Sequence, residues 1–184
     1  MNAKWVLILI AAVICGGCNS GSIETGGSSG STRSPSIAFS ACDANGVSQI
    51  VLAEPNGANQ RVLTRGSNPS WFPAWSPDGT RLLFARDVRE FAGGGDVPQI
   101  WIVNADGTGA RLLVTGGMSL AGSWSADGKR IAYARRTDLA QGLKIWIAQA
   151  DGSQARRLTN VADPTVDENV PRWAPGGTQI TFTS

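Results

Sequence analysis

The residues of this sequence best suited to catalysis are carboxylates, because the 184-residue chain contains no histidine. Histidine is the commonest general base and metal ligand, so its absence argues against hydrolytic triads and histidine-based metal centres. Asp78, Asp106, Asp127 and Asp151 each stand directly before a glycine. Such pairs are typical of tight turns, in which the carboxylate bonds nearby backbone and glycine adopts a positive φ. We interpret the four as turn formers and predict that the protein is not an enzyme.

Two other segments match the sequence pattern of a functional site but lack the structural elements or partner residues that such a site needs. Residues 26–30 match the G-x-S-x-G nucleophile pattern, but that motif needs a strand before it, a helix after it and a histidine partner. The segment 163–168 is the most acidic stretch and suits at most a weak Ca²⁺ contact, since it has no EF-hand signature. We therefore predict no cofactor and no metal site.

Residues 1–17 have the features of a lipoprotein signal peptide. Lys4 precedes an apolar or small-residue run from Trp5 to Cys15, which is shorter than the roughly twenty residues of a membrane-spanning helix. Residues 15–19, reading C-G-G-C-N, resemble a bacterial lipobox with Cys18 as the lipidated residue. The lipobox prefers leucine where Cys15 stands, so an ordinary secretory signal is the alternative. The usual signal for retention in the inner membrane is aspartate after the lipidated cysteine. Because Asn19 stands there instead, we expect the outer membrane.

Residues 18–35 are rich in glycine and serine. Such a segment buries too little apolar surface to fold, and we predict a flexible tether. With Cys15 removed and Cys18 lipidated, Cys42 is expected to be single and partly buried. A disulfide between Cys18 and Cys42 requires that lipidation fails.

From residue 36 onward the sequence repeats. Trp75, Trp124 and Trp173 each begin a turn-like block and are spaced by 49 residues. A short apolar run follows each block, with an early copy at residues 36–40. A third block, such as Q-I-W-I-V-N-A-D-G at 99–107, recurs at 144–152 and, more weakly, at 49–57. Each third block is followed by a short piece that begins with arginine, at residues 61–64, 111–114 and 157–159.

These pieces have the length and composition of β-strands bounded by turn residues. Four short strands in each unit of 45 to 50 residues are typical of a β-propeller blade. The pattern predicts an all-β fold over residues 36–184, a partial propeller with two complete and two incomplete four-stranded antiparallel blades. Residues 100–103 are apolar on both faces, so this strand should be covered on both sides.

The repeat resembles that of TolB-like β-propellers, with W-S-P-D-G, then I-W-x-x-[NQ]-A-D-G, then R-L-[LT]. The resemblance implies six blades behind a small α/β domain, and a Pal-like envelope lipoprotein as partner. Oligogalacturonate-lyase-type propellers are similar in repeat but rely on histidine-containing metal sites. The sequence starts inside one blade and stops two strands into a fourth. Truncation, self-association through the open faces and a small closed ring are the alternatives.

Two long connections, at residues 87–98 and 136–142, are expected at the same end of the propeller. Loops of this length often carry function, and tolerated surface variation is the alternative. The candidate partner-contact residues are Arg86, Arg89, Glu90, Phe91, Arg135, Arg136 and Asp138.

The leading functional hypothesis is a lipid-anchored envelope protein that binds other envelope proteins. A carbohydrate- or peptidoglycan-binding propeller, with stacking on Trp71 and Phe72, is the second. An accessory fragment of a propeller-containing peptidase is the third. The formal net charge of +2 is small and its charges are interspersed, so nucleic acid is not an expected partner.

Overall fold

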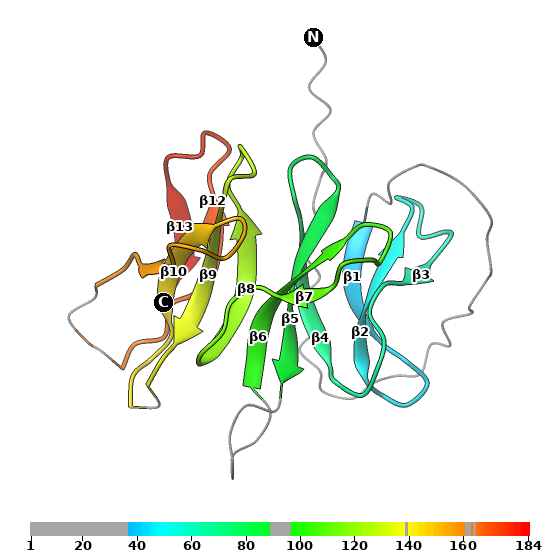
Figure 1. Ribbon diagram of the computed structural model, residues 1–184, viewed down its shortest axis with the longest axis horizontal. Helices are drawn as coiled ribbons and strands as arrows, with labels where there is room; N and C mark the ends of the chain where they lie inside the picture. The colour runs from blue at the N-terminus through cyan, green and yellow to red at the C-terminus, as the bar shows by residue number, and fades with distance from the viewer. Residues whose placement is uncertain (1–36, 89–96, 139, 161–162, 164) are drawn as a thin grey trace.

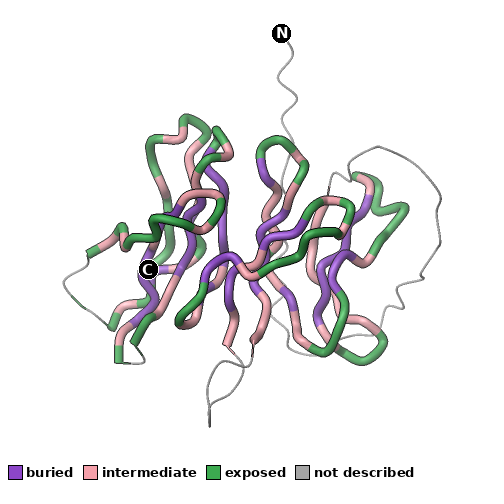
Figure 2. The backbone as a smooth tube through the Cα atoms, viewed as in Figure 1, coloured by how far each residue is buried: buried purple, intermediate pink, exposed green. Residues whose placement is uncertain are grey.

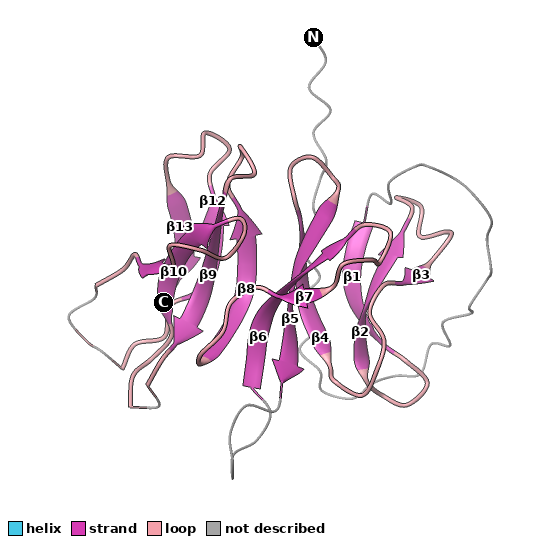
Figure 3. Ribbon diagram, viewed as in Figure 1, coloured by secondary structure: helices cyan, strands magenta, loops and turns pink. Residues whose placement is uncertain are grey.

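The described part of the chain consists of strands and turns. The computed structural model describes residues 37–88, 97–138, 140–160, 163 and 165–184. Thirteen strands form four antiparallel sheets, and no helix occurs among these residues (Figure 3). The described residues accordingly offer no helix that could cross a membrane. The predicted signal peptide and tether lie outside the described residues.

The four sheets stand side by side in chain order (Figure 1). We call them blades 1 to 4. Blade 1 consists of β1 (Ile37–Cys42), β2 (Ser48–Ala53) and β3 (Arg61–Val62). Blade 2 consists of β4 (Ser70–Trp75), β5 (Arg81–Val88), β6 (Val97–Asn104) and β7 (Arg111–Leu112). Blade 3 consists of β8 (Met118–Trp124), β9 (Arg130–Arg136), β10 (Lys144–Gln149) and β11 (Arg156–Arg157), and blade 4 of β12 (Asn169–Trp173) and β13 (Ile180–Thr183).

The predicted division into two complete and two incomplete blades is therefore confirmed. Within a complete blade, the first strand of the repeat lies at one side and the two-residue fourth strand at the other. In the incomplete blades, β1 corresponds in sequence to β5 and β9, while β12 and β13 correspond to a first and a second strand. The described sheets form an open arc rather than a closed ring (Figure 1).

The apolar core lies between neighbouring blades. Ile50, Leu52 and Leu63 of blade 1 pack with residues of blade 2 such as Leu82 and Phe84. The next two interfaces repeat this packing, and buried residues run along the middle of the sheets (Figure 2). Each fully buried leucine, isoleucine or phenylalanine contributes about 1.5–3 kcal/mol, so the blades depend on one another for stability.

Arginine–tryptophan pairs also join neighbouring blades. The Arg81 guanidinium of blade 2 lies 5.1 Å from the ring centroid of Trp124 in blade 3. Arg130 of blade 3 lies 4.7 Å from that of Trp173 in blade 4. These are cation–π distances. The repeat spacing of 49 residues thus places the same pair at successive interfaces.

The structure changes the expected bounds of one loop. Residues 87–98 were predicted to be an insert, but Asp87 pairs with Pro98 and Val88 with Val97. Strands β5 and β6 therefore continue into this segment, because valine favours extended backbone and both strands have a paired neighbour. Residues 89–96 lie outside the described residues.

Candidate binding surface

The described contact candidates lie at the end of the arc where second strands lead into third strands. β5 and β9 both end at this edge, and β6 and β10 both begin there (Figure 1). The described ends of the two connections therefore lie at the same end of the arc, as predicted. Arg89, Glu90 and Phe91 lie outside the described residues. Arg86, Arg135, Arg136 and Asp138 are described.

Arg86 and Arg135 occupy equivalent places and are held by their own blades. The Arg86 guanidinium lies 5.6 Å from the ring centroid of Trp101, and that of Arg135 lies 4.8 Å from that of Trp146. Each also donates hydrogen bonds to backbone carbonyls of the segment that enters its blade. Arg86 donates to the Arg65 carbonyl, whereas the acceptors of Arg135 are Thr115, at 2.8 Å, and Gly116.

Both arginines therefore stabilise the fold. Burial lowers the pKa of Arg86, which remains charged because arginine titrates far above neutral pH. Sequence reasoning placed these arginines among partner contacts and missed their tryptophan and carbonyl partners. The pattern that could have revealed them is the recurrence, in both complete repeats, of an arginine near the end of the second strand and a tryptophan in the third strand.

Arg136 and Asp138 lie further out on the same rim. Arg136 ends β9 and is half-buried, whereas Asp138 is exposed. The Asp138 carboxylate accepts a hydrogen bond from the Ala140 N–H at 2.9 Å, and the backbone carbonyl of Asp138 accepts one from the Gln141 N–H. Asp138 therefore shapes its own turn and leaves part of its carboxylate to solvent.

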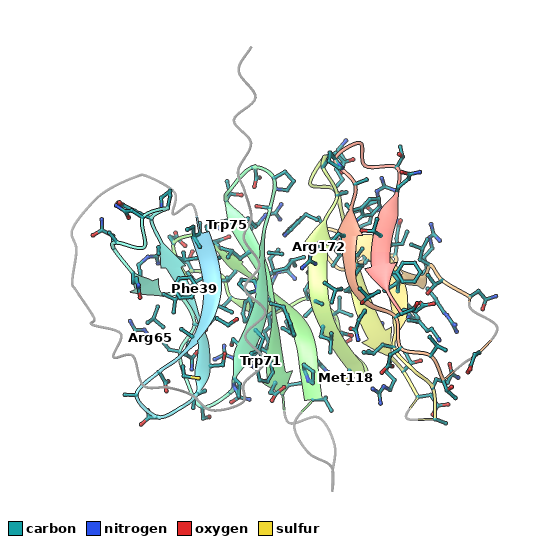
Figure 4. The ribbon with its side chains drawn as sticks, turned by 180° about the vertical axis from the view of Figure 1, so that it is seen from behind. Phe39, Arg65, Trp71, Trp75, Met118 and Arg172 are labelled. Atoms are coloured by element: carbon teal, nitrogen blue, oxygen red, sulfur yellow. The ribbon has the colours of Figure 1, made fainter. Side chains whose placement is uncertain are left out.

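A second surface lies along the first strands of blades 2 to 4. Sequence reasoning named only Trp71 and Phe72 of this surface, as residues that could stack on a sugar. Figure 4 looks onto the side of the arc where β4, β8 and β12 lie, and labels Trp71, Met118 and Arg172 on them. We define the inner-strand surface as these three residues with Phe72 and Val170. Phe72 and Val170 are each 39% exposed.

A bulge recurs in every strand of this surface. The pairing register shifts between Trp71 and Ala74 in β4, and at equivalent places in β8 and β12. At each bulge one residue other than glycine has a positive φ: 54° at Phe72, 56° at Ala121 and 49° at Val170. This conformation is unfavourable for bulky and β-branched residues. Strained backbone of this kind clusters at binding sites.

The inner-strand surface combines aromatic, aliphatic and cationic groups. Trp71 is half-buried beside the exposed Phe72. Arg172 is half-buried, and desolvation lowers its pKa. Its Nη1 donates to the Pro171 carbonyl at 3.0 Å. Tryptophan, phenylalanine, methionine and arginine are residue types enriched in protein interfaces.

The aspartates before glycine are turn formers, as predicted. The Asp78 carboxylate accepts hydrogen bonds from the hydroxyls of Ser76, at 2.6 Å, and Thr80, at 2.9 Å. These bonds, with one from the Thr80 N–H, lower the pKa of Asp78 to about 2. Asp106 and Asp127 have a lowered pKa for the same reason, hydrogen bonds from Thr108 and from Ser125.

The acidic segment before β12 is organised around Lys144. The Lys144 Nζ, on a side chain that is 2% exposed, donates to the Val166 carbonyl at 2.6 Å and the Asp163 carbonyl at 3.3 Å. The fully buried Glu168 accepts hydrogen bonds from the Thr159 hydroxyl and the Ile145 N–H. Within the described ranges, no group of three or more potential metal-ligating residues occurs.

The expectation for Cys42 was wrong in one respect. Cys42 is the last residue of β1 and is half-buried, but it is disulfide-bonded rather than single. Its partner lies outside the described residues. The expectation of a single cysteine rested on prior removal of Cys15 and lipidation of Cys18.

Four-stranded antiparallel sheets arranged side by side, with a very short strand at the outer edge of each complete sheet, define the class of β-propeller proteins. Residues 29–184 match the family model described as the TolB beta propeller domain. The chain belongs to this family.

Curated relatives agree with this assignment. The chain is 32% identical over 130 residues to the Tol-Pal system protein TolB of Anaeromyxobacter dehalogenans, a match that covers 70% of this chain and 27% of the relative. It is 33% identical over 140 residues to a protein TolB homolog of Chlorobium luteolum, covering 76% and 29%. The chain thus spans less than a third of the length of either relative.

A solved structure of a putative TolB from Agrobacterium tumefaciens is similar as well. It superposes with a TM-score of 0.66 at 26% sequence identity, covering 79% of this chain and 48% of that chain. The superposition supports the blade architecture described above.

Proposed function

We propose that this protein is a lipid-anchored envelope protein that binds another envelope protein through the inner-strand surface. The observation that carries the proposal is Phe72, an aromatic residue that is 39% exposed and held at a φ of 54°. The positive φ recurs at Ala121 and Val170 and belongs to the repeat, whereas the large exposed aromatic side chain is particular to Phe72. An interface anchor gains binding energy from such a position.

Family membership supports the cellular setting. The relative from Anaeromyxobacter dehalogenans is named for the Tol-Pal system, so a Pal-like lipoprotein is the first partner to test. Arg136 and Asp138 at the rim, with Arg89, Glu90 and Phe91, are additional contact candidates. Arg86 and Arg135 would act by holding the rim in shape, because their guanidinium groups already bond backbone carbonyls.

The partner experiment measures binding of a purified Pal-like lipoprotein from the same organism by calorimetry. Phe72→Asn should weaken binding at least tenfold and leave the fold intact, because asparagine tolerates positive φ. Phe182→Asn is the matched control, since Phe182 is 41% exposed but lies on β13. Equal loss in both variants would contradict the assignment of the inner-strand surface.

The anchor has its own experiment. Metabolic labelling with a fatty acid should label the wild-type chain and not Cys18→Ser. Because the sequence has three cysteines, the disulfide of Cys42 and the combination of Cys15 removal with Cys18 lipidation exclude each other within one chain. A labelled wild-type chain is the expected result, and an unlabelled chain would count against the anchor.

A carbohydrate ligand is the second candidate, favoured by the adjacent Trp71 and Phe72. Aromatic faces provide apolar contact area for sugar rings. Binding of peptidoglycan fragments that is lost in Trp71→Ala, but retained in Arg136→Ala, would favour this alternative over the protein partner.

A further inference from the structure

The half-buried arginines of the described chain follow one pattern, with a single exception. Most of them have a partner for the guanidinium group, which is a tryptophan ring, a backbone carbonyl or both. Those with a partner are Arg81, Arg86, Arg130, Arg135, Arg157 and Arg172. The exception is Arg136, whose guanidinium has no hydrogen bond, ion pair or ring contact with any residue that the structure describes.

The backbone of Arg136 is nevertheless fixed. Arg136 ends β9 and pairs with Met118, the first residue of β8. A Cβ placed on Gly117 would overlap the Arg136 carbonyl oxygen, so the segment that enters blade 3 lies directly against this residue. The side chain of Arg136 therefore extends from a well-defined point on the rim.

The stem of Arg136 lies on the face of blade 3 that packs against blade 4. Ala134 and Leu120 of this face pack with Ile180 of blade 4. Side chains two residues apart on a strand point to the same face, so Arg136 and Met118 lie side by side at its rim end. Of the guanidinium nitrogens, Nε alone is buried without a partner. The two Nη groups consequently lie toward solvent.

The carboxylates at this end of blade 3 have other partners. Asp138 accepts a hydrogen bond from the Ala140 N–H at 2.9 Å, and Asp167 accepts one from the Leu143 N–H at 2.6 Å. Neither of them forms an ion pair with Arg136. A partly desolvated donor without an acceptor costs free energy, which an acceptor on a bound partner would recover.

We propose that Arg136 binds a carboxylate of the partner protein, supplied by an aspartate or glutamate next to an apolar residue that packs on Met118. This inference rests on the proposed function and names the chemistry that the rim selects. Guanidinium groups match carboxylates through two parallel hydrogen bonds, and methionine adapts to apolar partners of different shape. Blade 2 has Asp87 at the equivalent position, so the preference for an acidic group belongs to blade 3.

A phosphate group fits this site less well than a carboxylate. Phosphate-bearing partners are usually recognised by clustered arginines. The neighbouring Arg135 already donates to the Thr115 and Gly116 carbonyls. Asp138, an exposed residue two positions further along the chain, repels a doubly charged group more strongly than a singly charged one.

The first experiment needs no protein partner. It measures the NMR signals of the arginine Nε–H groups in the full, nitrogen-15-labelled chain, and the signal that Arg136→Lys removes identifies Arg136. A glutamyl-leucine peptide blocked at both ends should shift this signal at least fivefold more than the glutaminyl-leucine peptide or inorganic phosphate does. Equal shifts with the two peptides, no shift at millimolar peptide, or a larger shift with phosphate would overturn the proposal.

The second experiment is calorimetry with the purified Pal-like lipoprotein. Arg136→Gln should weaken binding at least tenfold and leave Tm nearly unchanged, because the guanidinium has no partner to lose among the described residues. Arg156→Gln is the matched control, since it removes the same charge from an exposed position on β11 of the same blade. Equal losses in the two variants would assign the effect to net charge and overturn the proposal.

The two experiments separate this inference from the proposed function. Binding that is lost in Phe72→Asn and unchanged in Arg136→Gln would support the inner-strand surface and overturn the role of Arg136. A lipoprotein that does not bind the wild-type chain would contradict the proposed partner, and the peptide experiment would then decide the role of Arg136 by itself.

Discussion

At the scale of single residues, hydrogen-bonded aspartates hold the turns between first and second strands. Asp78 accepts bonds from two hydroxyls and one N–H of its own turn. Asp127 occupies the equivalent turn of blade 3 and accepts bonds from Ser125 and Lys129. Because hydrogen bonds to the ionised form favour that form, these turns couple stability to pH.

Thermal stability should therefore fall between pH 5 and pH 2. The pKa of Asp78 is lowered from 3.8 to about 2 in the folded state. Its contribution is present above the unfolded value of 3.8 and is lost as the pH falls toward 2. Asp78→Asn should flatten the dependence of Tm on pH in this range. Equal slopes in wild type and Asp78→Asn would contradict this account.

The strain at the inner-strand bulges can also be measured. Val170 has a φ of 49° and is 39% exposed. Replacement by asparagine, which tolerates this conformation, should raise the free energy of unfolding by about 1 kcal/mol. The same replacement at Val62, a half-buried residue of β3, should lower it. Chemical denaturation of both variants provides the comparison, and a loss of stability at Val170 would show that its contacts outweigh the strain.

At the scale of elements, a turn glycine of blade 3 is required for close packing on blade 2. Gly152→Ala should cost about 3 kcal/mol or more, because the new methyl group adds an overlap with the Leu113 carbonyl to the strain of a φ of +89°. Gly128→Ala should cost only about 1 kcal/mol, since its φ is +68° and the nearest atom lies at an ordinary 3.7 Å. Similar losses by thermal denaturation would count against the close approach.

The segment that leads into blade 4 depends on a buried cation. Lys144→Leu should cost about 1–3 kcal/mol, because the Val166 carbonyl loses its donor. Lys144→Gln should be milder, since Gln49, at the equivalent position of blade 1, donates to the Gly66 carbonyl at 2.8 Å. Urea denaturation of the two variants measures the difference. If Lys144→Gln lowered the free energy of unfolding as much as Lys144→Leu, the fold would require the positive charge of Lys144 rather than its hydrogen bond.

At the scale of the whole molecule, neighbouring blades share their cores and should unfold together. Leu52 and Leu63 of blade 1 pack with Leu82 and Phe84 of blade 2, so neither blade buries its apolar face alone. Phe84→Ala should lower the free energy of unfolding by about 3–5 kcal/mol, because Phe84 is fully buried. Scanning calorimetry should show a single transition in both proteins, and a separate early transition of one blade would contradict this account.

Much of this architecture follows from local sequence. Asp-Gly turns and the 49-residue spacing of Trp75, Trp124 and Trp173 predict strands, turns and blades, because turn geometry and strand alternation depend on neighbouring residues. The division into two complete and two incomplete blades follows from counting the repeats.

Tertiary structure decided what lies between the blades and on their surfaces. The partners of Arg86 and Arg135, the burial of Glu168, the positive φ of Phe72 and the exposure of Leu158 all depend on the three-dimensional packing of blades and linkers. Sequence alone showed short pieces that begin with arginine at 61–64, 111–114 and 157–159, and the pairing of each with its third strand makes Leu63, Leu113 and Leu158 equivalent. Only the packing distinguishes them, because the exposure of a strand residue is set by the blade that covers it.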